Sequence, residues 1–145
     1  MGTNFYFFTK SKETATHMGP KAEVVDEPEF GYELHIAKTS AGWLPLFEAH
    51  YDIRSVRDLK KFYYNAIRHD DTMTIFDEYG KAYTWPEFER RVIQHGAPKI
   101  WNAKDGYYDG NWRSEADNDC EKPWNHWEGE WSDCDGYRFQ ESEFI

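Results

Sequence analysis

The clearest structural pattern in the sequence is a stripe of apolar side chains between residues 55 and 68. Ser55 is suited to cap the start of a helix there, and Asp58 places a negative charge near the positive end of the helix dipole. Apolar residues then recur at the spacing of one helix face: Val56, Leu59, Phe62, Tyr63, Ala66 and Ile67. We therefore expect an amphipathic helix over residues 55–68.

A second helix is predicted over residues 84–95. Thr84 and Glu87 have the spacing of a capping box, and Pro86 falls in the first turn, where its missing N–H costs nothing. Its buried face is then expected to carry Trp85, Phe88 and Val92.

Runs of β-branched and aromatic residues predict the strands. They cover residues 3–9, 32–37, 43–51, 72–76, 81–83 and 137–139. Residues 10–30 are polar and contain Gly19-Pro20, which predicts a long loop. We predict an α+β fold: an antiparallel sheet with two helices and an acidic, Trp-rich C-terminal section.

Aromatic residues compensate for a low overall share of hydrophobic residues. The chain has 145 residues, of which 39% are hydrophobic, and it contains 7 Trp, 10 Tyr and 10 Phe. Each buried aromatic ring removes about 150–250 Å² from water, so the chain has enough apolar surface for one core. We expect a single domain over residues 1–145, with an α+β body over residues 1–96 and an aromatic extension over residues 97–145 packed on it.

The charge of the chain is strongly negative and unevenly distributed. The formal net charge is -10, and the last 49 residues hold 12 acidic against 5 basic residues. Because phosphate backbones and anionic membranes repel such a chain, we predict no direct nucleic-acid or membrane partner and favour a basic protein partner. Solubility alone is the competing explanation. No long apolar run or signal peptide is apparent, so we expect a cytoplasmic protein whose Cys120 and Cys134 are free thiols.

One cluster of hydrogen-bond donors is a candidate ligand site. Residues 38–42 follow the strand predicted over residues 32–37, and Gly42 permits close approach of a backbone to a ligand. These groups suit an anion such as a phosphate, although the Walker A glycines are absent. A polar hairpin loop is the structural alternative. The candidate ligand-binding residues are Asn4, His35, Lys38, Thr39, Ser40 and Trp43.

Two further kinds of chemistry have weaker sequence support. His35 and His50 flank the same predicted hairpin and have the side-chain type suited to proton transfer, with Asp77 and Glu78 as conceivable carboxylates. Cys120, His126 and Cys134 lack paired zinc-ligand spacing, and the acidic run after Asp117 has Lys122 where a calcium loop needs glycine. We predict no metal and no cofactor, and the catalytic residues stay unknown.

The acidic, Trp-rich C-terminal stretch is the candidate partner-binding surface. Tryptophan is enriched at binding hot spots, and carboxylates between tryptophans can pair with Arg and Lys of a basic partner. Coverage of the core edge by these rings is the alternative. The candidate residues are Asp117, Asp119, Glu121, Trp124, Trp127, Glu128, Glu130 and Trp131.

Three short motifs resemble those of a family of small, largely uncharacterised bacteriophage proteins. They are Gly2-Thr3-Asn4-Phe5-Tyr6, His35-Ile36-Ala37-Lys38-Thr39-Ser40-Ala41-Gly42-Trp43 and Asp77-Glu78-Tyr79-Gly80. The resemblance covers about residues 1–95 and the closing residues 136–144, and it implies a phage origin. Many members carry a Cys-x-x-Cys pair between the first two motifs, whereas residues 7–34 here contain no cysteine.

These observations lead to three functional hypotheses. The first is a non-enzymatic phage accessory protein that binds and inhibits a host protein, such as an anti-CRISPR-like or nucleic-acid-mimicking counter-defence inhibitor. The second is a nucleotide-phosphate binding protein or enzyme that uses His35, Lys38, Thr39 and Ser40. The third is a virion or assembly component.

Overall fold

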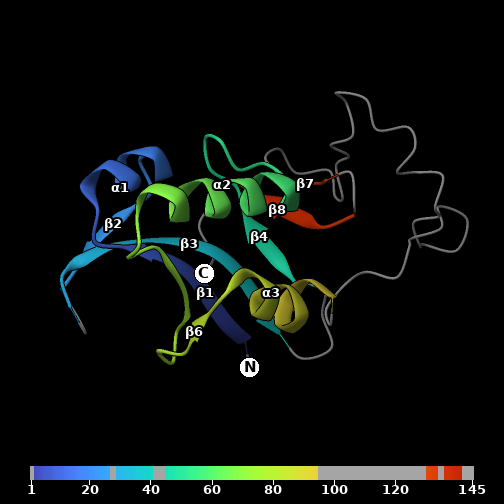
Figure 1. Ribbon diagram of the computed structural model, residues 1–145. Helices are drawn as coiled ribbons and strands as arrows, with labels where there is room; N and C mark the ends of the chain where they lie inside the picture. The colour runs from blue at the N-terminus through green and yellow to red at the C-terminus, as the bar shows by residue number, and fades with distance from the viewer. Residues whose placement is uncertain (1, 27–28, 41–44, 95–129, 134–135, 142–145) are drawn as a thin grey trace, which may run out of the picture.

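The described strands of the computed structural model form one eight-stranded mixed sheet (Figure 1). The structure describes residues 2–26, 29–40, 45–94, 130–133 and 136–141. The strand order is β6-β5-β1-β3-β4-β8-β7, and β2 pairs separately with β3. The strands are β1 (Gly2–Thr9), β2 (Glu23–Val25), β3 (Gly31–Ser40), β4 (Leu46–Glu48), β5 (Thr74–Asp77), β6 (Ala82–Tyr83), β7 (Glu130–Ser132) and β8 (Arg138–Gln140).

The α+β prediction is confirmed, with one difference in the sheet. Every described strand pair is antiparallel except β4 and β8, which run parallel. A parallel pair needs a crossover connection rather than a hairpin, so the turn signals of the sequence carried no information about it. The β7–β8 pair places residues 130–132 and 138–140 in the same sheet as β1.

The helices are α1 (Lys12–Met18), α2 (Val56–His69) and α3 (Trp85–Phe88), which continues into the π-helix η1 (Glu89–Gln94). Figure 1 shows α1 and α2 along the same side of the sheet. The ring of Phe7 in β1 stacks on Phe62 and Tyr63 of α2, and Phe5 contacts Phe88 edge-on. Since Phe5 and Phe7 lie on one face of β1, α2 and α3 cover that face.

Both predicted helix starts are confirmed. The Ser55 hydroxyl accepts a hydrogen bond from the backbone N–H of Asp58 at 3.0 Å. At the second helix, the Thr84 N–H donates to the Glu87 carboxylate at 2.9 Å, and the Glu87 N–H donates back to the Thr84 hydroxyl. The predicted single helix over residues 84–95 instead changes to a π-helix after Phe88.

The loop predicted over residues 10–30 is wrong in part, because it contains α1 and β2. Ser11 caps α1 by accepting from the Thr14 N–H, a start signal that the polar composition hid. Thr14, Ala15 and Met18 are the buried side of this short helix. Tertiary contact therefore stabilises a helix too short to form alone.

The core is built mainly from aromatic rings, as the composition predicts. Trp85 packs between Tyr63 and Phe88, with ring centroids 6.2 and 5.4 Å away. At the other end of the sheet, Phe139 of β8 stacks on Phe47 of β4 at 5.2 Å. Rings from β1, β4, β8 and two helical segments thus share one hydrophobic cluster.

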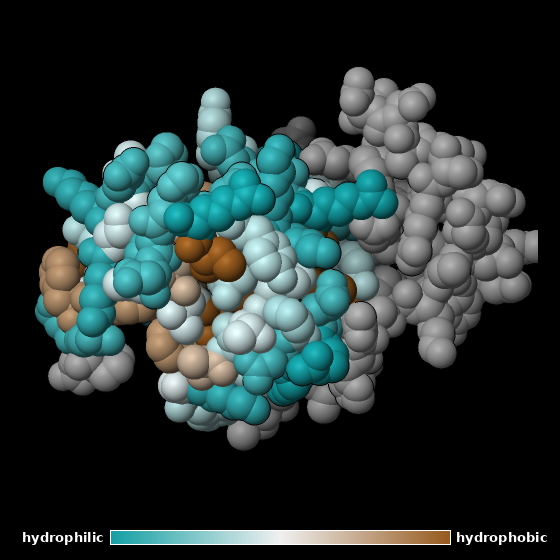
Figure 2. All heavy atoms as spheres, in the orientation of Figure 1, coloured by the Kyte–Doolittle hydropathy of each residue, from teal (hydrophilic) through white to brown (hydrophobic). Residues whose placement is uncertain are grey.

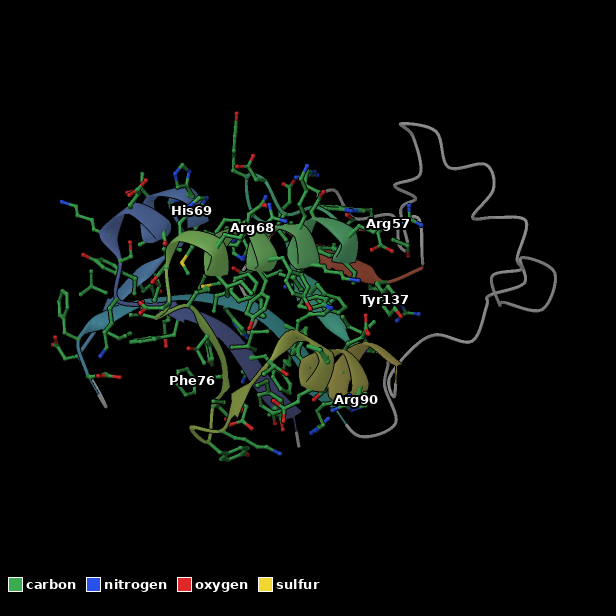
Figure 3. All side chains as sticks on the ribbon, viewed as in Figure 1. Arg57, Arg68, His69, Phe76, Arg90 and Tyr137 are labelled. Carbon is green, nitrogen blue, oxygen red and sulfur yellow. The ribbon has the colours of Figure 1, made fainter. Side chains whose placement is uncertain are left out.

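Hydrophilic side chains cover α1 and α2, with a small hydrophobic area visible below α2 (Figure 2). Arg57, Arg68 and His69 lie on the outward side of α2, and Phe76 lies on the far side of the sheet (Figure 3). In the part of the chain that the structure describes, no helix is long and apolar enough to cross a membrane.

Candidate functional site

The first part of the predicted Lys38 loop, residues 38–40, belongs to a strand instead, and residues 41–42 lie outside the described residues. β3 extends to Ser40, so Lys38 pairs with Asn4 and Thr39 pairs with Thr3 across the β1–β3 ladder. Thr39 is a β-branched residue, and its pairing with β1 helps to continue the strand to Ser40, three residues past the predicted strand end. The structure thus places Asn4 and Lys38 on one face of the sheet and Thr39 on the other. Trp43 lies outside the described residues.

The face of β1 and β3 opposite the helices carries polar side chains. Side chains alternate between the two faces of a strand, so Asn4 and Tyr6 lie on the face of β1 that is not covered by the helices, away from Phe5 and Phe7. The Tyr6 ring stacks on the His35 ring with centroids 4.8 Å apart. The backbone N–H and the side-chain amide of Asn4 both donate to Glu78 Oε1, at 2.7 and 3.1 Å. We call the surface formed by Asn4, Tyr6, Glu23, Glu33, His35 and Glu78 the Tyr6 face.

Beside this face, His50 fills a gap in the edge of β3. On the edge of β3 that faces away from β1, β2 pairs with residues 31–33 and β4 pairs with Ala37 and Lys38, so no described strand pairs with this edge between them. His50 Nε2 donates a hydrogen bond to the backbone carbonyl of His35 at 2.8 Å. The imidazole therefore satisfies a carbonyl that a neighbouring strand would otherwise have bonded.

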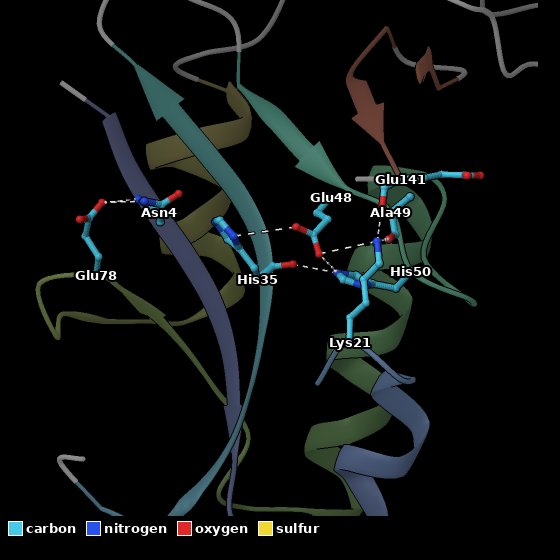
Figure 4. A network of polar contacts seen from close by, with 8 residues as sticks. All are labelled: Asn4, Lys21, His35, Glu48, Ala49, His50, Glu78 and Glu141. Carbon is cyan, nitrogen blue, oxygen red and sulfur yellow. Dashed lines mark hydrogen bonds and ion pairs between the residues drawn. The ribbon is translucent and has the colours of Figure 1, made fainter. Parts of the chain in front are cut away.

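The carboxylate of Glu48 lies at the centre of a buried polar cluster (Figure 4). Its oxygens are 3.9 Å from His35 Nδ1, 3.8 Å from His50 Nε2 and 3.8 Å from Lys21 Nζ. The Lys21 ammonium also donates to the backbone carbonyls of Ala49 and Glu141. We call Lys21, His35, Glu48 and His50 the Glu48 cluster.

Burial lowers the pKa of both histidines in this cluster. Desolvation is the main cause for each, and it brings the pKa of His35 and of His50 from 6.5 to about 4. Both rings are therefore neutral near pH 7, and Lys21 supplies the positive charge beside Glu48. A buried carboxylate is strongly disfavoured without such a partner, which accounts for the position of Lys21.

The acid–base prediction is met only in part. The structure brings His35 and His50 together, but Asp77 lies on the helix-covered face of the sheet and accepts a hydrogen bond from the Tyr83 hydroxyl at 2.9 Å. The sequence did not single out Glu48, the acid that approaches both rings. Its separations of 3.8 and 3.9 Å exceed hydrogen-bond length, so they provide no direct proton path between Glu48 and either ring.

Carboxylates surround Tyr6. Burial raises the pKa of the Tyr6 hydroxyl first, and the charges of Glu33, Glu78, Glu23 and Glu48 raise it further. Glu23 and Glu33 are direct cross-strand partners in the β2–β3 ladder. Burial and the charge of Glu23 raise the pKa of Glu33. Directly opposed like charges destabilise a sheet, so this pair carries a local energetic cost.

The predicted partner-binding stretch lies mostly outside the described residues. That applies to Asp117, Asp119, Glu121, Trp124, Trp127 and Glu128, and also to Cys120 and Cys134. Glu130 begins β7.

Trp131, the last predicted partner-binding residue, is a core residue in this structure and not part of an exposed surface. Its ring stacks on Phe139 at 5.9 Å and its Nε1 donates to the Arg54 carbonyl at 3.1 Å. The Arg54 guanidinium covers the indole, 4.1 Å from the ring centroid.

Within the described ranges, no group of three or more His, Cys, Asp or Glu side chains is arranged to hold a metal ion. Comparison of the chain with protein-family models, with curated proteins and with solved structures finds no match.

Proposed function

We propose that the protein is a phage accessory protein that binds a basic host protein through a carboxylate-rich surface, the Tyr6 face, and inhibits it. The resemblance of the three motifs supports the phage origin, and the net charge of -10 supports a positively charged partner. A nucleic-acid-binding defence protein is the specific partner class, because its own binding groove is cationic.

The observation that carries this proposal is the opposition of Glu23 and Glu33 on the Tyr6 face. Two carboxylates in direct register repel each other in the free protein. An arginine or lysine from a partner would relieve this repulsion. Binding would then be more favourable than at a sheet surface without directly opposed carboxylates. Glu78, held by Asn4 next to Tyr6, adds a third carboxylate to the same face.

The same carboxylates disfavour the nucleotide-phosphate hypothesis at Lys38. Lys38 is the register partner of Asn4, whose side chain is bonded to Glu78. A phosphate at Lys38 would therefore lie close to the Glu78 carboxylate and meet like-charge repulsion. The Tyr6 face is better matched to a cation than to an anion.

The test is a pull-down from lysate of the bacterial host at low and high salt. The variant Glu23→Gln/Glu33→Gln/Glu78→Gln removes three carboxylates from the Tyr6 face. The control Glu13→Gln/Asp52→Asn/Asp71→Asn removes three exposed carboxylates elsewhere. We expect a basic protein to be recovered at low salt, to be lost with the Tyr6-face variant and to be retained by the control.

Two results would contradict the proposal. One is recovery of no basic protein at low salt, and the other is equal recovery by the wild type and the Tyr6-face variant. Adding the purified protein to the recovered partner then measures inhibition directly, and an unchanged partner activity would exclude an inhibitory role.

A further inference from the structure

A second charged site, of opposite sign, lies where β6 meets the helical segment α3–η1. Among the described residues, a hollow of about 550 Å³ is lined there by Lys81, Tyr83, Glu87, Arg90 and Arg91. We call it the Lys81 hollow. Its size falls within the range of small-ligand sites, about 300–1,000 Å³.

The cations of the Lys81 hollow make no ion pair with any described carboxylate. Aromatic rings hold two of them instead. The Lys81 ammonium lies 5.2 Å from the centroid of Tyr83, and the Arg91 guanidinium lies 5.8 Å from the centroid of Phe5. A cation–π contact orients a cation without neutralising its charge, so the hollow keeps its positive field.

The π-helix explains why two adjacent arginines reach this place. Val92 and Ile93 of η1 are both buried in the core, while Arg90 and Arg91 are exposed. Figure 3 shows Arg90 on the outward side of this segment. Widened helical turns of this kind occur often at functional sites.

The acidic lining residue, Glu87, already has a structural partner. Its carboxylate accepts the Thr84 N–H in the capping box, and this bond is the main reason why its pKa is lowered, with Arg90 and Lys81 contributing. Asp77 nearby is buried and bonded to Tyr83. The hollow is therefore lined by three cations and one carboxylate, that of Glu87. This carboxylate is held in the capping box by the Thr84 N–H.

We propose that the Lys81 hollow binds the phosphate groups of a compact polyphosphate anion. Arginine forks and a lysine ammonium are the side chains that recognise phosphate oxygens. A long polyanion would meet the repulsion of the whole acidic chain, whereas a small one meets mainly the local field within a Debye length of about 8 Å. Short inorganic polyphosphates such as tripolyphosphate share this chemistry with nucleoside triphosphates.

Calorimetric titration of the full chain tests this site, with tripolyphosphate, ATP and adenosine as separate ligands. We expect tripolyphosphate and ATP to bind, and adenosine not to bind. The variant Arg90→Gln/Arg91→Gln should raise Kd at least tenfold. The matched control Lys60→Gln/Arg68→Gln, which removes two exposed cations of α2, should leave Kd within twofold.

ATP binding tighter than tripolyphosphate would identify a nucleotide as the source of the phosphates, and equal affinity would identify recognition of phosphate alone. The proposal is overturned if neither anion binds the wild type, if the control weakens binding as much as the variant does, or if adenosine binds as well as ATP. A melting temperature for each variant, measured without ligand, separates loss of binding from loss of folding.

Discussion

At the scale of single residues, the Glu48 cluster shows how one buried carboxylate orders its surroundings. Glu48 is almost fully buried, so its charge requires Lys21 nearby and excludes further carboxylates. His50 supplies a neutral donor that completes the edge of β3. The Nδ1 atom of His35 faces Glu48, and the His35 ring stacks on the ring of Tyr6. His35 thus links the Glu48 cluster to the Tyr6 face.

The lowered histidine pKa values make stability depend on pH in a definite direction. His50 titrates near 6.5 when unfolded and at about 4 when folded. As pH falls from 6.5 towards 4, the unfolded state takes up a proton that the folded state does not, so the free energy of unfolding decreases. We expect His50 to contribute a loss on the order of 3 kcal/mol across this window, with no further loss below it.

Urea denaturation at several pH values checks this expectation through the variant His50→Gln. The glutamine amide can still donate to the His35 carbonyl but does not titrate. The free energy of unfolding of the wild type, relative to that of the variant, should therefore decrease as pH falls from 6.5 to 4. The exposed His69 offers the control His69→Gln. A difference that does not vary with pH would contradict the assignment of a lowered pKa to His50.

At the scale of elements, helix caps were the most predictable part of the fold. Ser55 and the Thr84–Glu87 box were identified from side-chain chemistry alone, because a cap needs only neighbours three residues away. The change from α3 to a π-helix was not predictable in this way. It follows from the burial of both Val92 and Ile93, which depends on the shape of a core that distant strands form.

The capping box gives a prediction for the element that carries the Lys81 hollow. We expect Thr84→Ala to lower the free energy of unfolding by about 1 kcal/mol, since it leaves the Glu87 N–H without its acceptor. Thr84→Ser keeps a hydroxyl and should stay close to the wild type. Chemical denaturation of the three proteins measures the effect, and equal stability of Thr84→Ala and wild type would show that the box adds nothing to this helix.

At the scale of the whole molecule, sequence patterns predicted the layers but not the order of the strands. Runs of β-branched and aromatic residues over residues 3–9 and 32–37 located β1 and β3, yet no local signal indicated that β4 pairs in parallel with β8. The same limit applies to the sites. Asn4, His35 and Lys38 were expected together and are together, whereas Glu48 and Lys21 meet only through tertiary structure.

The position of β7 and β8 leads to a prediction about cooperativity. Phe139 of β8 and Trp131 of β7 belong to the same hydrophobic cluster as Phe5 and Phe7 of β1. The Ala49 N–H after β4 also donates to the Gln140 carbonyl at 2.7 Å. Because these strands share one core, separating β7 and β8 would expose rings on both sides of the break, at a cost of several kcal/mol.

Native-state hydrogen exchange measures this directly. We expect the slowest amides of β8 to exchange with the same free energy as those of β1 and β3, and to respond equally to low denaturant, since only global unfolding would release them. Amides of β8 that exchange through a lower-energy opening, insensitive to denaturant, would contradict the single-core view. The strands would then be a separable unit, and Trp131 would become accessible to a partner in the opened state, as the sequence had first suggested.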